Sequence, residues 1–373
     1  MTGKIFGFIV APALLTLCLP SPQALAETRG YVISWFATAT YIENLKEACP
    51  DGRNGTIVDM HIRDIQSLGY TKEQATAFMN STKDPENKPR ELADKYRNSA
   101  VVNGKNVSIY SYPDAAQDPN METVSGKYAY GFDLGGKNET SKFADPETSA
   151  KIDNQLWRAV GCEHSYLVRP PLMPYPEEVA WNIFIDSAPA WSLQITGEDL
   201  SKDGPVTVTL DRTTQHLERD AAAYVLAGTT YIVEASQRSH NVLKGEIKNG
   251  MLTITPQNVY LEGEMPHYAE IDLINAHMRL KLEPDGKLVG YWGGYLDWQR
   301  YAYMIMTRPG NDADHIGIYW ALKKMADADP DPVKGQNRRI SGTFRVEAVP
   351  AFLTDTKGRI IATPMGSAEL AAN

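Results

Sequence analysis

Cysteine is scarce in this chain of 373 residues, which contains only three. No C-x-x-C pair occurs, so the chain has neither the usual ligand spacing of a structural zinc site nor a covalent haem attachment motif. Basic residues are not in surplus either, because 37 Lys and Arg stand against 46 Asp and Glu, a net charge of −9. That balance argues against a nucleic-acid-binding protein, which needs a basic surface to meet the phosphates.

The motifs of several enzyme classes are also missing. The sequence has no G-x-S-x-G nucleophile elbow, no phosphate-binding loop, no dinucleotide-binding fingerprint and no H-E-x-x-H zinc motif. We find no internal repeat, and after residue 26 no apolar run approaches the roughly 20 residues of a membrane span. What remains is a chain with 43% hydrophobic residues, enough to bury a substantial core.

The first 26 residues have the composition of a secretory signal peptide. Lys4 precedes an apolar run from Ile5 to Leu19, and the segment ends in the small-residue motif Ala24-Leu25-Ala26. The run is too short for a membrane anchor. We therefore expect cleavage before Glu27 and a periplasmic or secreted protein. Its net charge changes from −9 to −10, because Lys4 is the only charged residue removed.

Cys49 and Cys162 are the two cysteines that remain after this cleavage. An exported protein enters an oxidising compartment, in which disulfides form and persist. We therefore expect a disulfide between them. The alternative is two free thiols, with Cys162 beside Glu163 and His164 as a nucleophile or metal ligand.

The spacing of apolar residues changes along the mature chain. Residues 27–177 read as a mixed helical and loop-rich region with a buried N-terminal strand. Residues 178–373 alternate apolar and polar side chains, with hairpin turns at Asn249-Gly250 and Asp285-Gly286 and one helix near 315–327. Many short strands at this spacing predict a mainly β fold, an antiparallel β-sandwich or a barrel-like domain.

Polar side chains are concentrated between residues 131 and 162, in a glycine-containing loop that leads into a short helix. We interpret them as a ligand site or a structural polar cluster, in which buried side chains hold the loop by hydrogen bonds. Oxygen ligands in a flexible loop also suit Ca²⁺, for which Asp133 and Asp153 are the candidate metal ligands. If no cation binds there, Arg158 is the expected partner of the buried acids. The cluster comprises Asp133, Asn138, Asp145, Asp153, Asn154, Gln155 and Arg158.

Aromatic residues gather in the stretch from Gly290 to Trp298. Trp292, Tyr295 and Trp298 could form a stacking platform for a sugar or another flat ligand, but a β-rich core also uses such residues. Both interpretations stay open.

Two segments resemble sequences of an uncharacterised family of exported bacterial proteins. The first is Ile152-Asp-Asn-Gln-Leu-Trp-Arg-Ala-Val-Gly-Cys162, and the second is Tyr319–Phe352, with its Asp-Pro-Asp-Pro run and Glu347-Ala-Val-Pro-Ala-Phe352. The resemblance extends over about half of the mature chain and rests on these two segments. The resemblance implies export and, since no activity is known for that family, supplies no catalytic residues.

Two functions follow from these observations. The first is a non-catalytic binding or scaffold protein whose partner is a small molecule, a glycan or a periplasmic protein. The second is an exported hydrolase of a glycan or ester that uses a carboxylate pair from Asp133, Asp153 and Asp297, held about 5–10 Å apart. We favour the first because no nucleophile or metal motif emerges. Beyond Ca²⁺, the sequence indicates no cofactor.

Overall fold

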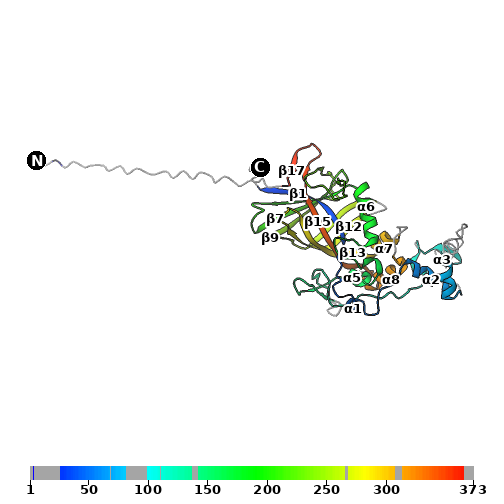
Figure 1. Cartoon of the computed structure of the whole chain (residues 1–373). Coiled ribbons are helices and arrows are strands. Elements are labelled where there is room, and N and C mark those ends of the chain that lie inside the picture. The colour runs from blue at the N-terminus through cyan, green and yellow to red at the C-terminus, as the bar shows by residue number, and fades with distance from the viewer. Residues whose placement is uncertain are drawn as a thin grey trace.

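The computed structural model describes residues 26–67, 69–80, 99–109, 111–136, 142–264, 268–306 and 313–364, as well as Gly3. Its central feature is a closed antiparallel barrel of eight strands (Figure 1). The mainly β fold is thus confirmed, in its barrel form. Around the barrel the strands are β1 (Glu27–Thr38), β6 (Trp191–Gly197), β7 (Gly204–Arg212), β9 (Asn241–Lys248), β10 (Met251–Ile254), β12 (Tyr268–Leu282), β13 (Leu288–Asp297) and β15 (Asn337–Pro350).

The N-terminal strand closes the barrel. β1 pairs with β6 on one side and with β15 on the other, so it lies between elements more than 150 residues away in the sequence. The buried strand expected at the start of the mature chain is therefore a member of the main sheet. Both expected hairpins are confirmed, since Asn249-Gly250 joins β9 to β10 and Asp285-Gly286 lies between β12 and β13.

Aromatic side chains fill the inner face of the barrel. The ring of Phe36 in β1 lies 5.8 Å from Trp191, 6.0 Å from Trp292 and 4.5 Å from Phe344, measured between ring centroids. All four are buried. Because side chains alternate between the two faces of a strand, the residues that flank them, such as Tyr291, point outward.

Helices pack against one side of the barrel (Figure 1). α6 (Tyr175–Ser187) contacts β1 and β12, and α7 (Trp298–Met306) contacts β12, β13 and β15. α5 (Gln155–Val160) and α8 (His315–Met325) contact β15 and each other. The helix expected near 315–327 is confirmed as α8, but α7 was not expected. Its aromatic residues are typical of strands, yet Asp297 accepts hydrogen bonds from Gln299 N and Arg300 N and starts a helix.

The remaining elements are short. They are α1 (Leu45–Ala48), α2 (Ile57–Ser67), α3 (Lys72–Asn80), η1 (Pro113–Ala115), η3 (His164–Tyr166), β2 (Ser99–Val102), β3 (Lys105–Ser108), β4 (Phe143–Ala144), β5 (Lys151–Ile152), β8 (Thr230–Ile232), β11 (Gln257–Glu264), β14 (Ala328–Pro330), β16 (Phe352–Thr354) and β17 (Ile360–Ala362). Within the described ranges, no helix is both long and apolar enough to cross a membrane.

Candidate functional site

A cleft of about 430 Å³ lies on the outer face of the barrel. Its floor is formed by β1, β15, β13 and β12, and its walls come from residues 40–43, 130, 147 and 169–174. The loop-rich region thus covers part of the barrel surface and leaves a hollow between the two layers.

The floor of the cleft consists of cross-strand rows of outward-pointing residues. In one row Ala37 is opposite Arg345, Arg345 is opposite Tyr291, and Tyr291 is opposite Arg279. The small side chain of Ala37 leaves room at the end of this row. Its centre is a tyrosine ring between two guanidinium groups, and the Arg279 guanidinium carbon lies 5.6 Å from the Tyr291 ring centroid.

A second row runs beside the first. Trp35 is opposite Glu347, Glu347 is opposite Val289, and Val289 is opposite Lys281. Trp35 is half-buried, and the Lys281 side chain is largely exposed. The two rows therefore bring three cations and two aromatic rings onto one small area of the barrel.

Tyrosines from the loops complete an aromatic wall. Tyr130 stacks on Tyr291 at 4.7 Å with an interplanar angle of 18°, and Tyr41 meets Tyr130 edge-on at 5.8 Å. Burial raises the pKa of Tyr291, so its hydroxyl stays protonated. The wall can thus offer ring faces and neutral hydroxyl groups to a ligand.

The carboxylates that line the cleft lie close to cations of the cleft. Glu147 lies 3.3 Å from Arg279, Glu283 lies 3.1 Å from Lys281, and Glu43 lies 3.6 Å from Arg169.

Arg345 differs from the other cations of the cleft. Its Nη2 donates to Glu347 at 2.6 Å. Its Nη1 is buried and has no hydrogen-bond partner among the described residues.

The predicted polar cluster lies behind this wall and supports it. Asn154 caps α5 by accepting from Trp157 N at 3.0 Å, and its Nδ2 donates to the carbonyl of Tyr130 at 2.8 Å. Asp145 is fully buried and lies 3.1 Å from Arg279. Although burial acts to raise it, hydrogen bonds from Thr148 and Arg279 hold the pKa of Asp145 below its usual value. Two members of the cluster therefore fix residues of the cleft.

Asp133 and Asp153 are brought together by a lysine. Lys142 Nζ lies 2.8 Å from Asp133 and 4.0 Å from Asp153, and the lysine side chain is nearly buried. Asp153 also accepts from Leu134 N at 2.9 Å and from Gly136 N at 3.4 Å. Within the described ranges, no group of three or more His, Cys, Asp and Glu side chains is arranged to hold a metal ion. Calcium binding at Asp133 and Asp153 stays a prediction.

Arg158 contacts the loop before α5, α5 itself and an aromatic ring. Its Nη1 donates to the carbonyl of Val124 at 2.7 Å, its Nε donates to Gln155 Oε1 at 3.1 Å, and its guanidinium lies 4.0 Å above the ring of Phe143. The backbone N–H of Gln155 donates to Ser341 Oγ in β15 at 3.0 Å. These contacts tie α5 to the loop before it and to the barrel. Asn138 lies outside the described residues.

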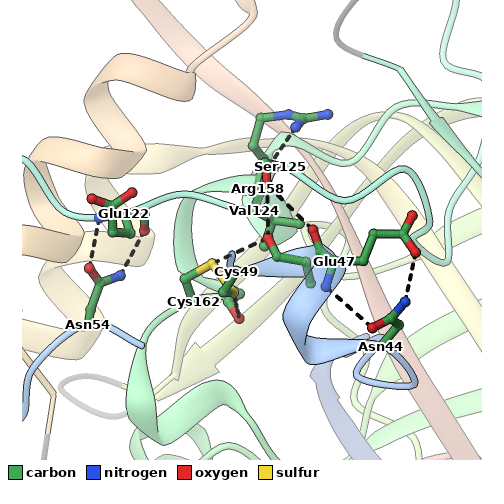
Figure 2. Close-up of a disulfide and its surroundings, with 11 residues drawn as sticks. Asn44, Glu47, Cys49, Asn54, Glu122, Val124, Ser125, Arg158 and Cys162 are labelled. Carbon is green, nitrogen blue, oxygen red and sulfur yellow. Dashed lines mark hydrogen bonds between the residues drawn. A yellow bond between two sulfur atoms is a disulfide. The ribbon is translucent and has the colours of Figure 1, made fainter. Parts of the chain in front are cut away.

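The expected disulfide between Cys49 and Cys162 is present (Figure 2). It joins the residue after α1 to the residue after Gly161 at the end of α5, within a small buried cluster that also contains Val124. Tyr41 and Ile42 of the cleft pack against this same cluster. The disulfide therefore fixes the segment that carries one wall of the cleft.

The residues proposed as an aromatic platform are mostly in the core. Trp292 is fully buried in the barrel and Trp298 is buried at the start of α7, while Tyr295 is half-buried on the outer face. Trp292 and Trp298 thus serve packing. The alternation of strand residues separates Trp292 from Tyr291, which does line the cleft.

The candidate carboxylate pairs lie away from the cleft. Asp133 and Asp153 meet at Lys142, and Asp297 caps α7 beside a smaller hollow lined by Glu270, Asp272 and Arg300. The cleft lining contains none of these three aspartates.

Among the residues that the structure describes, none of the site residues predicted from the sequence lines the cleft. Arg279 and Lys281 alternate with Met278 and Leu280, which is the ordinary pattern of a solvent-facing strand surface. The one additional signal is the number of tyrosines, 19 in the chain. Which part of the surface a loop covers depends on contacts between distant segments.

No protein-family model matches this chain, and no curated protein or solved structure matches it.

Proposed function

We propose that this chain is an exported binding protein that holds a small ligand in the cleft on the outer face of its barrel. The observation that carries the proposal is the cleft itself, at about 430 Å³, with aromatic and charged side chains converging on it. Ligand sites in proteins are concave, of about 300–1,000 Å³, and combine ring surfaces with a few placed polar groups.

Export is part of the proposal. It is supported by the composition of residues 1–26 and by the disulfide, since disulfides are rare in reducing compartments. The resemblance to exported bacterial proteins agrees with it.

Binding is favoured over hydrolysis by the charges in the cleft. Glu147, Glu283 and Glu43 each lie within 4 Å of a cation. The aspartates predicted as a catalytic pair, Asp133, Asp153 and Asp297, do not line the cleft. A glycosidase needs one carboxyl that can give up a proton to the leaving group.

The test is a screen of the mature protein against a library of neutral sugars, organic acids and amines, followed by ligand-observed NMR. We expect compounds that bind the wild type to lose affinity in Trp35→Ala and Tyr41→Ala, which remove an aromatic ring from the floor and one from the wall of the cleft. Tyr224→Ala is the matched control, because Tyr224 is 74% exposed and does not line the cleft. Compounds that bind all four proteins equally would contradict the proposal.

A further inference from the structure

We infer that the ligand of the cleft is a small ring compound that carries a carboxylate, with the carboxylate bound by Arg345. This inference rests on the proposed binding function and names the class of ligand. It is carried by three features of the cleft: an incompletely satisfied guanidinium, carboxylates that are already paired, and ring surfaces around them.

The first step is the hydrogen bonding of Arg345. A guanidinium has five N–H donors in a planar fork. In Arg345, Nη2 meets Glu347, whereas Nη1 is buried with no acceptor among the described residues. The Nη1 atom itself is shielded from solvent, but the Arg345 side chain lines the cleft and is 22% exposed, so a ligand oxygen can approach the guanidinium from its accessible side. If the side chain turns so that Nη1 donates to that oxygen, the penalty of a buried donor without an acceptor is also removed.

The second step concerns the sign of the ligand charge. A cationic ligand would have to compete with Arg279, Lys281 and Arg169 for the glutamates of the cleft. An anionic ligand does not have to displace Glu347 from Arg345, because Glu347 is bound by Nη2 and the Nη1 donors of the same guanidinium lack an acceptor in the described part of the chain. Lys281, in the neighbouring row, is a further cation of the cleft, and its side chain is 59% exposed. Arginine suits a planar carboxylate because the two can form parallel hydrogen bonds.

The third step concerns the part of the ligand that lies next to its carboxylate. Arg345 is flanked on the floor by Tyr291 and Ala37, and Trp35 lies in the next row. A group bound to Arg345 thus has aromatic side chains on neighbouring strands and a small residue beside it. This arrangement favours a ring next to the carboxylate, with one face on an aromatic side chain. Acidic saccharides and aromatic acids share that chemistry.

The experiment compares ligands that differ only in charge, by calorimetry on the mature protein. Digalacturonate is paired with neutral galactobiose, and 4-hydroxybenzoate is paired with 4-hydroxybenzamide. We expect at least one acid to bind about tenfold or more tightly than its neutral partner, the ratio expected for a charge-assisted hydrogen bond. The pair that shows the difference identifies the saccharide or the aromatic source.

Arg345→Gln should abolish most of this difference, so that the acid binds about as tightly as its neutral partner. Arg338→Gln is the matched control, because Arg338 is on the same strand and pairs with Asp329 outside the cleft. It should retain the full preference for the acid.

Three results would overturn the inference. In the first, acids and neutral partners bind equally and Trp35→Ala weakens both, in which case the cleft binds a ligand but not through charge. In the second, none of the four compounds binds at about 10 mM, near the weak limit of specific recognition. The third is an acid preference that Arg345→Gln leaves intact. In each case the library screen decides separately whether the cleft binds any ligand.

Discussion

Glu177 is a fully buried carboxyl group at the N-terminal end of α6. Thr38 N donates to it at 2.7 Å and Tyr301 OH donates to it at 2.6 Å, while Tyr166 OH lies 2.9 Å from Tyr301 OH. Burial raises the pKa of Glu177. The network connects β1, α6, α7 and η3, so one side chain holds four elements at the edge of the barrel.

Glu177→Ala should therefore destabilise the protein strongly. The substitution leaves the buried donors of Thr38 and Tyr301 without their acceptor, and we expect a loss on the order of 3 kcal/mol in the free energy of unfolding. Urea unfolding measures it. Glu178→Ala is the control, because Glu178 is exposed on the same helix turn and its removal should change stability little. Similar midpoints for both variants would contradict a structural role for the network.

A second buried acid, Glu163, predicts a pH dependence. Burial, with the charge of Asp314 as a smaller contribution, raises the pKa of Glu163 to about 7 although Ser165 donates to it. Between the ordinary value near 4.5 and 7 the folded state binds a proton that the unfolded state has lost. The contribution of Glu163 to stability is therefore present below pH 4.5 and lost as the pH rises to 7.

Glu163→Gln should remove this dependence. The stability of the variant relative to the wild type should increase from pH 4 to pH 8, by up to about 3 kcal/mol. Chemical unfolding at several pH values measures the difference, and using the difference cancels the contributions of all other groups. Parallel pH profiles for the two proteins would show that the pKa of Glu163 is not raised in the folded protein.

At the scale of elements, the loop-rich region is held to the barrel by a few fixed points. Asp145 reaches Arg279 in β12, the backbone of Gln155 reaches Ser341 in β15, and the disulfide joins the ends of α1 and α5 (Figure 2). Members of the polar cluster predicted from the sequence therefore hold the loop-rich region against the barrel. Polar side chains in a loop next to a sheet often have this role, because buried loop backbone needs partners.

Removing the disulfide should loosen this region. Its sequence separation of 113 residues predicts a stabilisation of about 5 kcal/mol in the chain-entropy model. The double variant Cys49→Ala/Cys162→Ala should unfold at correspondingly lower urea concentration and should bind any cleft ligand more weakly, because Tyr41 and Ile42 pack on the same cluster. Unchanged stability in the double variant would mean that the two segments are held by other contacts.

At the scale of the whole molecule, the barrel depends on its first strand. β1 separates β6 from β15 and contributes Phe36 to the aromatic interior. Without β1, two strand edges and an apolar interior would be exposed, and exposed edges of this kind aggregate.

The fragment 178–373 should therefore not fold by itself, although it contains seven of the eight barrel strands. We expect no cooperative thermal transition and no dispersed NMR spectrum. The full mature chain, residues 27–373, serves as the control. A soluble fragment with a sharp transition would show that residues 178–373 form an independent domain.

The local features of this protein can be predicted from its sequence. Alternation of apolar and polar residues predicts strands such as Gly204–Arg212, the turn residues predict two hairpins, and Asp314 predicts the start of α8, where its Oδ1 accepts from Gly317 N at 2.8 Å. The pairing of Cys49 with Cys162 follows because no other cysteine remains after residue 26. The strands, hairpins and helix start depend on residues close together in the chain, and the disulfide pairing depends on there being only two cysteines after residue 26.

The cleft and the closure of the barrel depend on contacts across long sequence separations. Tyr291 and Arg345 become neighbours only when β13 pairs with β15, and Tyr130 stacks on Tyr291 only when its loop, held by Asn154 through the Tyr130 carbonyl, packs on the barrel. An outward-facing arginine on a strand has the same local pattern whether solvent or a loop covers it. The sequence by itself therefore determined which residues point outward, and the tertiary structure alone decided which of them line a site, because that depends on how distant segments pack.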